Sequence, residues 1–208
     1  GQHTSLRRGA RPRMLSLLGP AGVGKSRLLE HFAERLQDLG VRVVRVRPEP
    51  LRPYGLWIAV LQQLLYGHKP ARNEAEVRER LEALGRDLEP GASRALLDQA
   101  SIAAALLGLR EAPQGEPESM APRIRHLIAR CVDAVAQRSR SSLVILLDEL
   151  QEADPSSVTM LLSLPAALHC EQPPLFVVAD RRAFDRPAGV EMRQIPINPL
   201  ADEATEAL

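Results

Sequence analysis

The sequence predicts an α/β fold in which helices pack on both faces of a mainly parallel β-sheet. Residues 14–18 form a short apolar run that enters a glycine-rich loop and then a helix, with apolar residues at helical spacing up to Gly40. Residues 143–147 and 175–179 are continuous apolar runs, which are typical of strands buried on both faces of a sheet. Strands that alternate with helices along a chain usually form a parallel sheet with helical crossovers. We therefore expect a three-layer sandwich.

The remaining elements follow from the same periodicities. β-branched residues predict a strand at 41–46, and a shorter strand is expected at 193–197. Helices are expected at residues 54–66, 73–88, 92–109, 124–137, 155–169 and from 201 onward. Asp154 precedes Pro155 and is best explained as the N-cap of its helix. Residues 111–122 contain three prolines and a glycine, which predicts a loop or mobile linker.

Length and composition indicate a globular domain with a large core. The chain has 208 residues, of which 45% are apolar. Its net charge of +1 provides no general attraction for nucleic acids or anionic membranes. Cys131 and Cys170 lie far apart in the sequence and match no metal-binding spacing, so we expect buried thiols in a reducing compartment. No apolar stretch approaches 18 residues and no signal peptide opens the chain, so a cytoplasmic location is expected.

Residues 19–26 satisfy the phosphate-binding P-loop pattern G-x-x-x-x-G-K-[ST]. The glycines of such a loop let the backbone N–H groups point at phosphate oxygens, and the following helix adds its positive dipole end. Lys25 is one of only two lysines in the chain, and we expect it to reach the β- and γ-phosphates. We expect the Ser26 hydroxyl to bind Mg²⁺. The nucleotide-binding residues expected from this pattern are Gly19, Pro20, Ala21, Gly22, Val23, Gly24, Lys25, Ser26 and Arg27.

Charged residues follow the two later apolar strands. Asp148 and Glu149 come directly after residues 143–147. Asp148 is expected to hold Mg²⁺ through its waters, and Glu149 to polarise a water for attack on the γ-phosphate. For Glu149 the alternative is a solvated turn residue.

Three more charged residues follow the strand at 175–179. Arg181 or Arg182 could contact the γ-phosphate, because the carboxyl ends of parallel strands face one crevice. The alternative is a solvent-exposed arginine pair, with Asp180 paired to one of them.

Several segments together resemble a known family. They are residues 19–29, 47–55, 148–157, 179–181 and 198–204. The chain resembles the AAA-like ATPase domain of STAND-type signalling proteins and large bacterial transcriptional regulators. The resemblance implies an ASCE/AAA-like P-loop NTPase fold with ATP and Mg²⁺ as cofactors. It also implies catalytic roles for Lys25, for Glu149 and, as the sensor, for Arg181, with Ser26 and Asp148 as metal ligands.

The resemblance also implies a domain organisation. Residues 1–13 are interpreted as an N-terminal tail or an expression remnant, 14–197 as the ATPase core, and 198–208 as the start of a truncated lid. A helical insertion is expected at about 51–122, which is unusually long for one crossover. Because residues 1–13 contain no Gly-Arg-acid motif to hold the adenine, we expect slow and weak ATPase activity from this piece of chain.

The expected function is a nucleotide-dependent switch in a larger signalling or regulatory protein. Its expected partners are other domains of the same polypeptide and, on binding ATP, further copies of the chain. No membrane or direct nucleic-acid contact is expected. The alternatives are a nucleic-acid-handling AAA+ ATPase, such as an initiator or loader, and an ATP-binding module that has lost hydrolysis. A small-molecule kinase is disfavoured because phosphoryl transfer to a substrate needs no water-activating acid such as Glu149.

Overall fold

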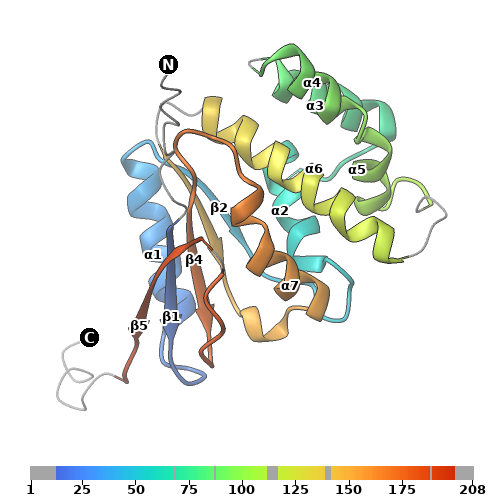
Figure 1. Ribbon diagram of the computed structural model, residues 1–208. Coiled ribbons are helices and arrows are strands. Elements are labelled where there is room, and N and C mark those ends of the chain that lie inside the picture. The colour runs from blue at the N-terminus through green and yellow to red at the C-terminus, as the bar shows by residue number, and fades with distance from the viewer. Residues whose placement is uncertain are drawn as a thin grey trace, which may run out of the picture.

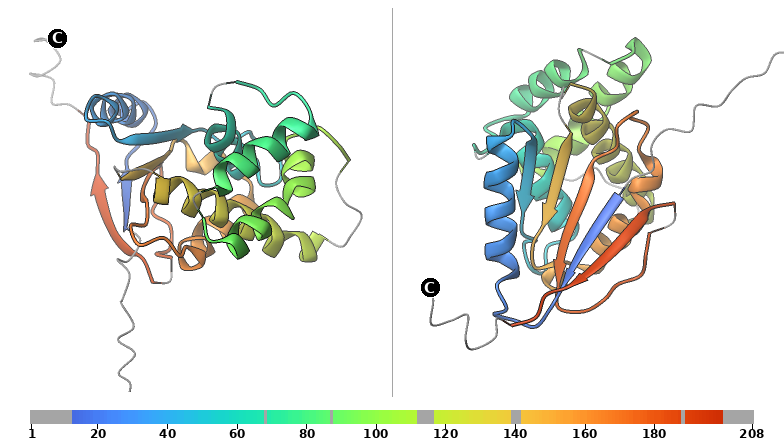
Figure 2. Two further views of the ribbon diagram at one scale, coloured as in Figure 1. Left: turned by 90° about the horizontal axis from the view of Figure 1, so that it is seen from above. Right: turned by 90° about the vertical axis from the view of Figure 1, so that its left-hand side faces the viewer.

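A five-stranded, fully parallel β-sheet forms the centre of the protein. The computed structural model describes residues 13–67, 69–86, 88–111, 117–138, 142–187 and 189–199. The strands are β1 (Arg13–Leu18), β2 (Arg42–Val46), β3 (Leu143–Leu147), β4 (Leu175–Asp180) and β5 (Glu191–Pro196). Their order across the sheet is β2-β3-β4-β1-β5, and every neighbouring pair is parallel (Figure 2, right). The α/β class and the parallel sheet predicted from the sequence are confirmed.

Helices cover both faces of this sheet and give three layers (Figure 1). One face packs against α1, with Leu29 and Ala33 buried on Leu17, Leu146 and Ala179. The other face packs against the apolar sides of further helices. The helices and short 3₁₀ turns are α1 (Lys25–Asp38), α2 (Gly55–Tyr66), α3 (Glu74–Gly85), α4 (Pro90–Leu97), α5 (Ala100–Leu106), α6 (Pro117–Arg138), η1 (Leu150–Glu152), α7 (Pro155–Ser163) and η2 (Pro165–Ala167).

The expected insertion between β2 and β3 is a helical subassembly that shares the core of the sheet. Helices α2 and α6 pack on the sheet together with α7, while α3, α4 and α5 lie outside them (Figure 2, left). Val77 and Leu81 of α3 and Ile102 of α5 belong to the same buried cluster as Phe176 of β4. The insertion is therefore part of the domain core.

Three element boundaries differ from the sequence prediction, each for a local reason. The helix expected at 92–109 is two helices, α4 and α5, separated by a turn at 98–99. The helix expected at 155–169 ends at Ser163, because Leu164 precedes Pro165 and the chain continues in η2. The linker expected at 111–122 ends early: α6 begins at Pro117, where a proline is tolerated, and Pro122 lies inside the helix.

Two strands start slightly earlier than the sequence predicts, and several other predictions fall on segments outside the described residues. The strand expected at 14–18 starts at Arg13, and the one expected at 193–197 starts at Glu191. Residues 1–12, 112–116 and 200–208 lie outside the described residues, so the tail, part of the linker and the helix from 201 stay predictions. Within the described segments, no helix is long and apolar enough to cross a membrane.

Candidate nucleotide-binding site

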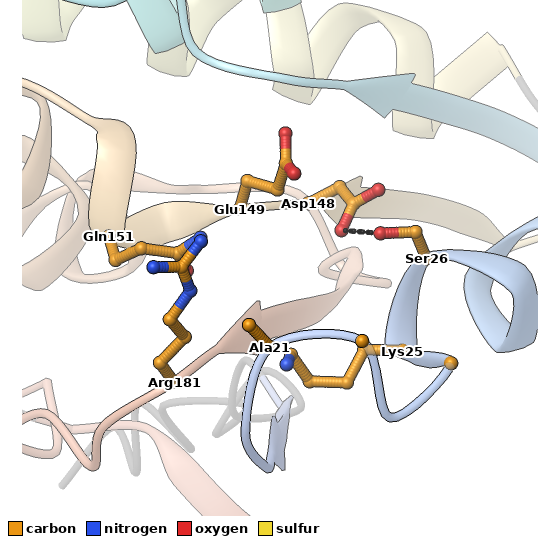
Figure 3. A pocket seen from close by; sticks show the side chains of 9 residues that line it. Ala21, Lys25, Ser26, Asp148, Glu149, Gln151 and Arg181 are labelled. Carbon is orange, nitrogen blue, oxygen red and sulfur yellow. Dashed lines mark hydrogen bonds between the residues drawn. The ribbon is translucent and has the colours of Figure 1, made fainter.

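The parallel sheet brings the charged residues that follow its strands to one edge. Leu18 at the end of β1 lies opposite Asp180 at the end of β4, and Leu147 at the end of β3 lies opposite Val178. The loop after β1, the pair Asp148–Glu149 and Arg181 therefore emerge side by side. They line one hollow of about 210 Å³, shown in Figure 3. The lining residues are Ala21, Gly22, Gly24, Lys25, Ser26, Asp148, Glu149, Gln151 and Arg181.

The loop between β1 and α1 has the geometry that an anion requires. Gly22 and Gly24 have φ values of 78° and 95°, which L-residues with side chains rarely adopt. Helix α1 begins directly afterwards, with no side-chain cap and no acidic residue in its first turn among the described groups. The N–H groups of that turn thus remain for a phosphate, and the helix dipole favours one.

Lys25 is held over this loop. Its Nζ donates hydrogen bonds to the carbonyl oxygens of Gly19 (2.7 Å) and Pro20 (2.8 Å). These are neutral partners, so the ammonium charge remains to bind a phosphate. Of the other predicted binding residues, Val23 is half-buried in the loop, and Arg27 is exposed on α1.

Ser26 and Asp148 meet across the sheet edge. The Ser26 hydroxyl donates to Asp148 Oδ1 at 3.0 Å, and Asp148 is only 1% exposed (Figure 3). A hydroxyl and a carboxylate are oxygen ligands of the kind that Mg²⁺ prefers, and both lie beside the phosphate loop. The residues present therefore fit a magnesium ion bound together with a nucleotide. Among the described residues, no cluster of three or more His, Cys, Asp or Glu side chains offers a separate metal site.

Glu149 lies at the hollow in an unusual backbone conformation. Its φ of 55° and ψ of 45° are left-handed, and its side chain is 44% exposed. Non-glycine residues with positive φ are uncommon and cluster at functional sites. The conformation places a solvent-accessible carboxylate next to buried Asp148, where it can accept a proton from a water.

Arg181 reaches the hollow, while Arg182 lines a neighbouring one. The Arg181 side chain is half exposed and lies 3.9 Å from Glu152 Oε1. Asp180 accepts the backbone N–H groups of Arg181 (2.5 Å) and Arg182 (3.2 Å), so it shapes the turn that presents them. Asp180 thus has a backbone role that the sequence did not predict, and its pairing with an arginine side chain stays the alternative.

Two residues of the site were missed by the sequence analysis. Arg47, just after β2, donates from Nε to Asp148 Oδ2 at 3.1 Å. Gln151 lines the hollow, and its Oε1 is buried with no hydrogen-bond partner among the described residues. The sequence alone could not have identified Arg47, because its contact with Asp148 depends on β2 lying beside β3, which only the sheet order reveals. Gln151 carries no sequence signal either, because it lies in a polar segment without periodicity.

The sheet order, the glycine loop and the facing acidic pair define a P-loop nucleoside-triphosphatase fold. A family model described as an AAA ATPase domain matches residues 3–178, and the chain belongs to this family. No curated protein matches the sequence.

The solved structures that this chain matches share little sequence with it. Cdc6p from Pyrobaculum aerophilum is 14% identical, with a TM-score of 0.40 over 89% of this chain and 40% of that one. A Drosophila ORC structure bound to DNA is 12% identical, with a TM-score of 0.37 over 94% and 86% of the two chains. The plasmid coupling protein TrwB in complex with ADP and Mg²⁺ is 14% identical, with a TM-score of 0.29 over 81% and 63%. This chain thus spans less than half of the Cdc6p chain that it resembles.

Proposed function

We propose that this domain binds and hydrolyses ATP, and that its nucleotide state acts as a switch in a larger signalling or regulatory protein. The observation that carries the proposal is the hollow in which the P-loop faces Asp148, Glu149 and Arg181. A site for nucleotide binding alone needs only the phosphate loop and a metal ligand. The additional exposed carboxylate and arginine support hydrolysis.

Each side chain has a separate task in this proposal. The α1 amides and Lys25 bind the phosphates, and Ser26 and Asp148 hold Mg²⁺, which screens the phosphate charge. Glu149 orients the attacking water and accepts its proton. Arg181 leaves Glu152 to contact the γ-phosphate, and so distinguishes ATP from ADP. The difference between the ATP-bound and ADP-bound states is passed on to other domains of the same polypeptide or to another copy of the chain.

ATP is preferred over GTP on the basis of the family. The chain belongs to the AAA ATPase domains, and its sequence contains no guanine-reading N-K-x-D motif.

The two lysines of the chain provide a matched test of nucleotide binding. Lys25→Ala should abolish Mg²⁺–ATP binding measured by calorimetry, because it removes the charge that binds the β- and γ-phosphates. Lys69→Ala removes the same charge from an exposed position outside the hollow and should leave the affinity unchanged. Equal affinity in the two variants would contradict the assignment of the P-loop.

Glu149→Gln tests hydrolysis separately from binding. The amide cannot take a proton from water, so turnover should fall at least tenfold while ATP affinity is retained. Glu82→Gln, on the exposed side of α3, is the control. Equal turnover in Glu149→Gln would remove Glu149 from the mechanism. ATP binding without turnover by the unaltered protein would indicate a module that has lost hydrolysis, and stimulation by added DNA would indicate a nucleic-acid-handling ATPase.

A further inference from the structure

Arg47 contacts both acidic residues of the site. We propose that Arg47 is the counter-ion of Asp148 in the metal-free protein and that Mg²⁺ displaces it, thereby releasing one end of the loop at residues 47–54. The proposal rests on the function proposed above and names the segment that moves when the nucleotide is loaded.

The contacts of Asp148 divide between its two oxygens. Oδ1 accepts from Ser26, whereas Oδ2 lies 3.1 Å from both Nε and Nη2 of Arg47. The carboxylate is almost fully buried, while the Arg47 side chain is 54% exposed. A buried carboxylate is strongly destabilised without an opposite charge, and Arg47 supplies that charge from the solvent side.

Arg45 also lies near Asp148 but is held elsewhere. Its guanidinium is 3.8 Å from Oδ2, and it makes a closer contact of 3.2 Å with Glu30 on α1. It also donates to the Ser26 carbonyl oxygen. Among the described residues, the second acid near Arg47 is Glu149, whose Oε2 lies 3.9 Å from Arg47 Nε. Arg47 is therefore the cation that can leave.

Magnesium and Arg47 compete for one carboxylate. A magnesium ion held by Ser26 and Asp148 would bring two positive charges to this carboxylate, which would then no longer need the guanidinium as its counter-charge. The ion and the Arg47 guanidinium would repel each other, and the carboxylate would favour the ion of higher charge. Binding of Mg²⁺ with the nucleotide thus weakens the Arg47 contact.

The loop at residues 47–54 begins at Arg47, and a second carboxylate holds its other end. Asp154 accepts the backbone N–H groups of Tyr54 (3.1 Å) and Gly55 (3.2 Å). Within the loop, Arg52 donates to the Leu106 carbonyl oxygen at the end of α5 (2.9 Å). Asp148 and Asp154 therefore hold opposite ends of residues 47–54, and only Asp148 is shared with the metal. Loading frees the segment that follows β2 while its far end stays on α5 and α7.

The affinity for a fluorescent ADP analogue, measured with Mg²⁺ and with EDTA, tests the competition. Arg47→Gln should bind the analogue at least fivefold more tightly than the unaltered protein in Mg²⁺, and no more tightly in EDTA. Arg94→Gln removes the same charge from an exposed position on α4 and should change neither value. Arg47→Lys keeps a positive charge and should bind the analogue with near-native affinity in Mg²⁺, which keeps the test valid if Arg47→Gln folds poorly.

The sign of the change separates the alternatives. If Arg47 only attracts the nucleotide, Arg47→Gln will bind more weakly in both conditions, and the proposal is wrong. If the unaltered protein binds the analogue neither with Mg²⁺ nor with EDTA, the proposed function itself is overturned.

Loop release can be observed at Leu51. This side chain is 95% exposed, whereas Cys131 and Cys170 are buried, so a spin label on Leu51→Cys attaches selectively. The label should become more mobile with ADP and Mg²⁺ but not with ADP and EDTA. In a labelled protein that also carries the Arg47→Gln substitution, it should be mobile without any nucleotide. Equal mobility in all three samples would contradict release of the loop.

Discussion

At the scale of single residues, Glu149 combines a catalytic position with an unfavourable backbone. Its left-handed conformation comes one residue after Asp148 has left β3 and turns the chain into η1. A left-handed backbone costs an L-residue about 1–2 kcal/mol, and such strain persists where a site requires it. The protein thus carries strain at the carboxylate that we propose to activate water.

Replacing Glu149 with glycine tests this strain. Because glycine adopts positive φ without steric cost, Glu149→Gly should raise the free energy of unfolding by about 1 kcal/mol while removing turnover. Urea denaturation and an ATPase assay measure the two effects. Glu152→Gly in η1 should lower stability, and a loss of stability in Glu149→Gly would show that the conformation is not strained.

At the scale of elements, one buried carboxylate joins the starts of two helices. Asp154 accepts the Ser157 N–H as the N-cap of α7, which confirms the sequence prediction. It also accepts the Ser157 hydroxyl and the backbone of residues 54 and 55, where α2 begins. The cap was predictable from Asp154–Pro155, but the link to α2, a hundred residues earlier, was not.

These contacts make Asp154 a source of pH-dependent stability. Burial by itself raises the pKa of Asp154, but the hydrogen bonds from Ser157, Tyr54 and Gly55 outweigh it and lower the pKa below the usual 3.8. The ionised form therefore stabilises the fold above the unfolded-state pKa, and this contribution is lost as the pH falls through the folded-state pKa.

Asp154→Asn should lower the free energy of unfolding at pH 7 by about 2 kcal/mol, since hydrogen bonds to a charged group are lost. It should also flatten the decline of stability in acid. Urea denaturation from pH 3 to pH 7 checks both effects. Asp98→Asn, at the exposed end of α4, should behave like the unaltered protein, and an unchanged acid profile in Asp154→Asn would contradict this role.

At the scale of the whole molecule, the insertion and the sheet share one core. Trp57 on α2 is fully buried and donates to the Ser157 carbonyl oxygen on α7. Burial raises the pKa of Cys131 on α6 to about 12. Burial together with Asp133 raises the pKa of Cys170 to about 12. All three residues belong to the buried cluster that also contains residues of α3, α4 and α5.

We therefore expect the domain to unfold as one unit. In urea at pH 8, labelling of the two cysteines should coincide with the fluorescence change of Trp57, because the thiols are buried and protonated in the folded protein. The circular dichroism of the helices should change at the same midpoint. Separate midpoints would show that the insertion is an independent domain.

The sequence by itself determined the parts of the site that lie on short segments. The spacing of residues 19–26 and the acids after 143–147 specify their chemistry locally, since a glycine turn, a helix start and a strand end each depend on neighbouring residues. The strand order, the split of α4 from α5, the contact of Arg47 with Asp148 and the reach of Asp154 to α2 were decided only by the tertiary structure. Each joins segments far apart in the chain, and their proximity follows from packing the insertion on the sheet, which no local pattern encodes.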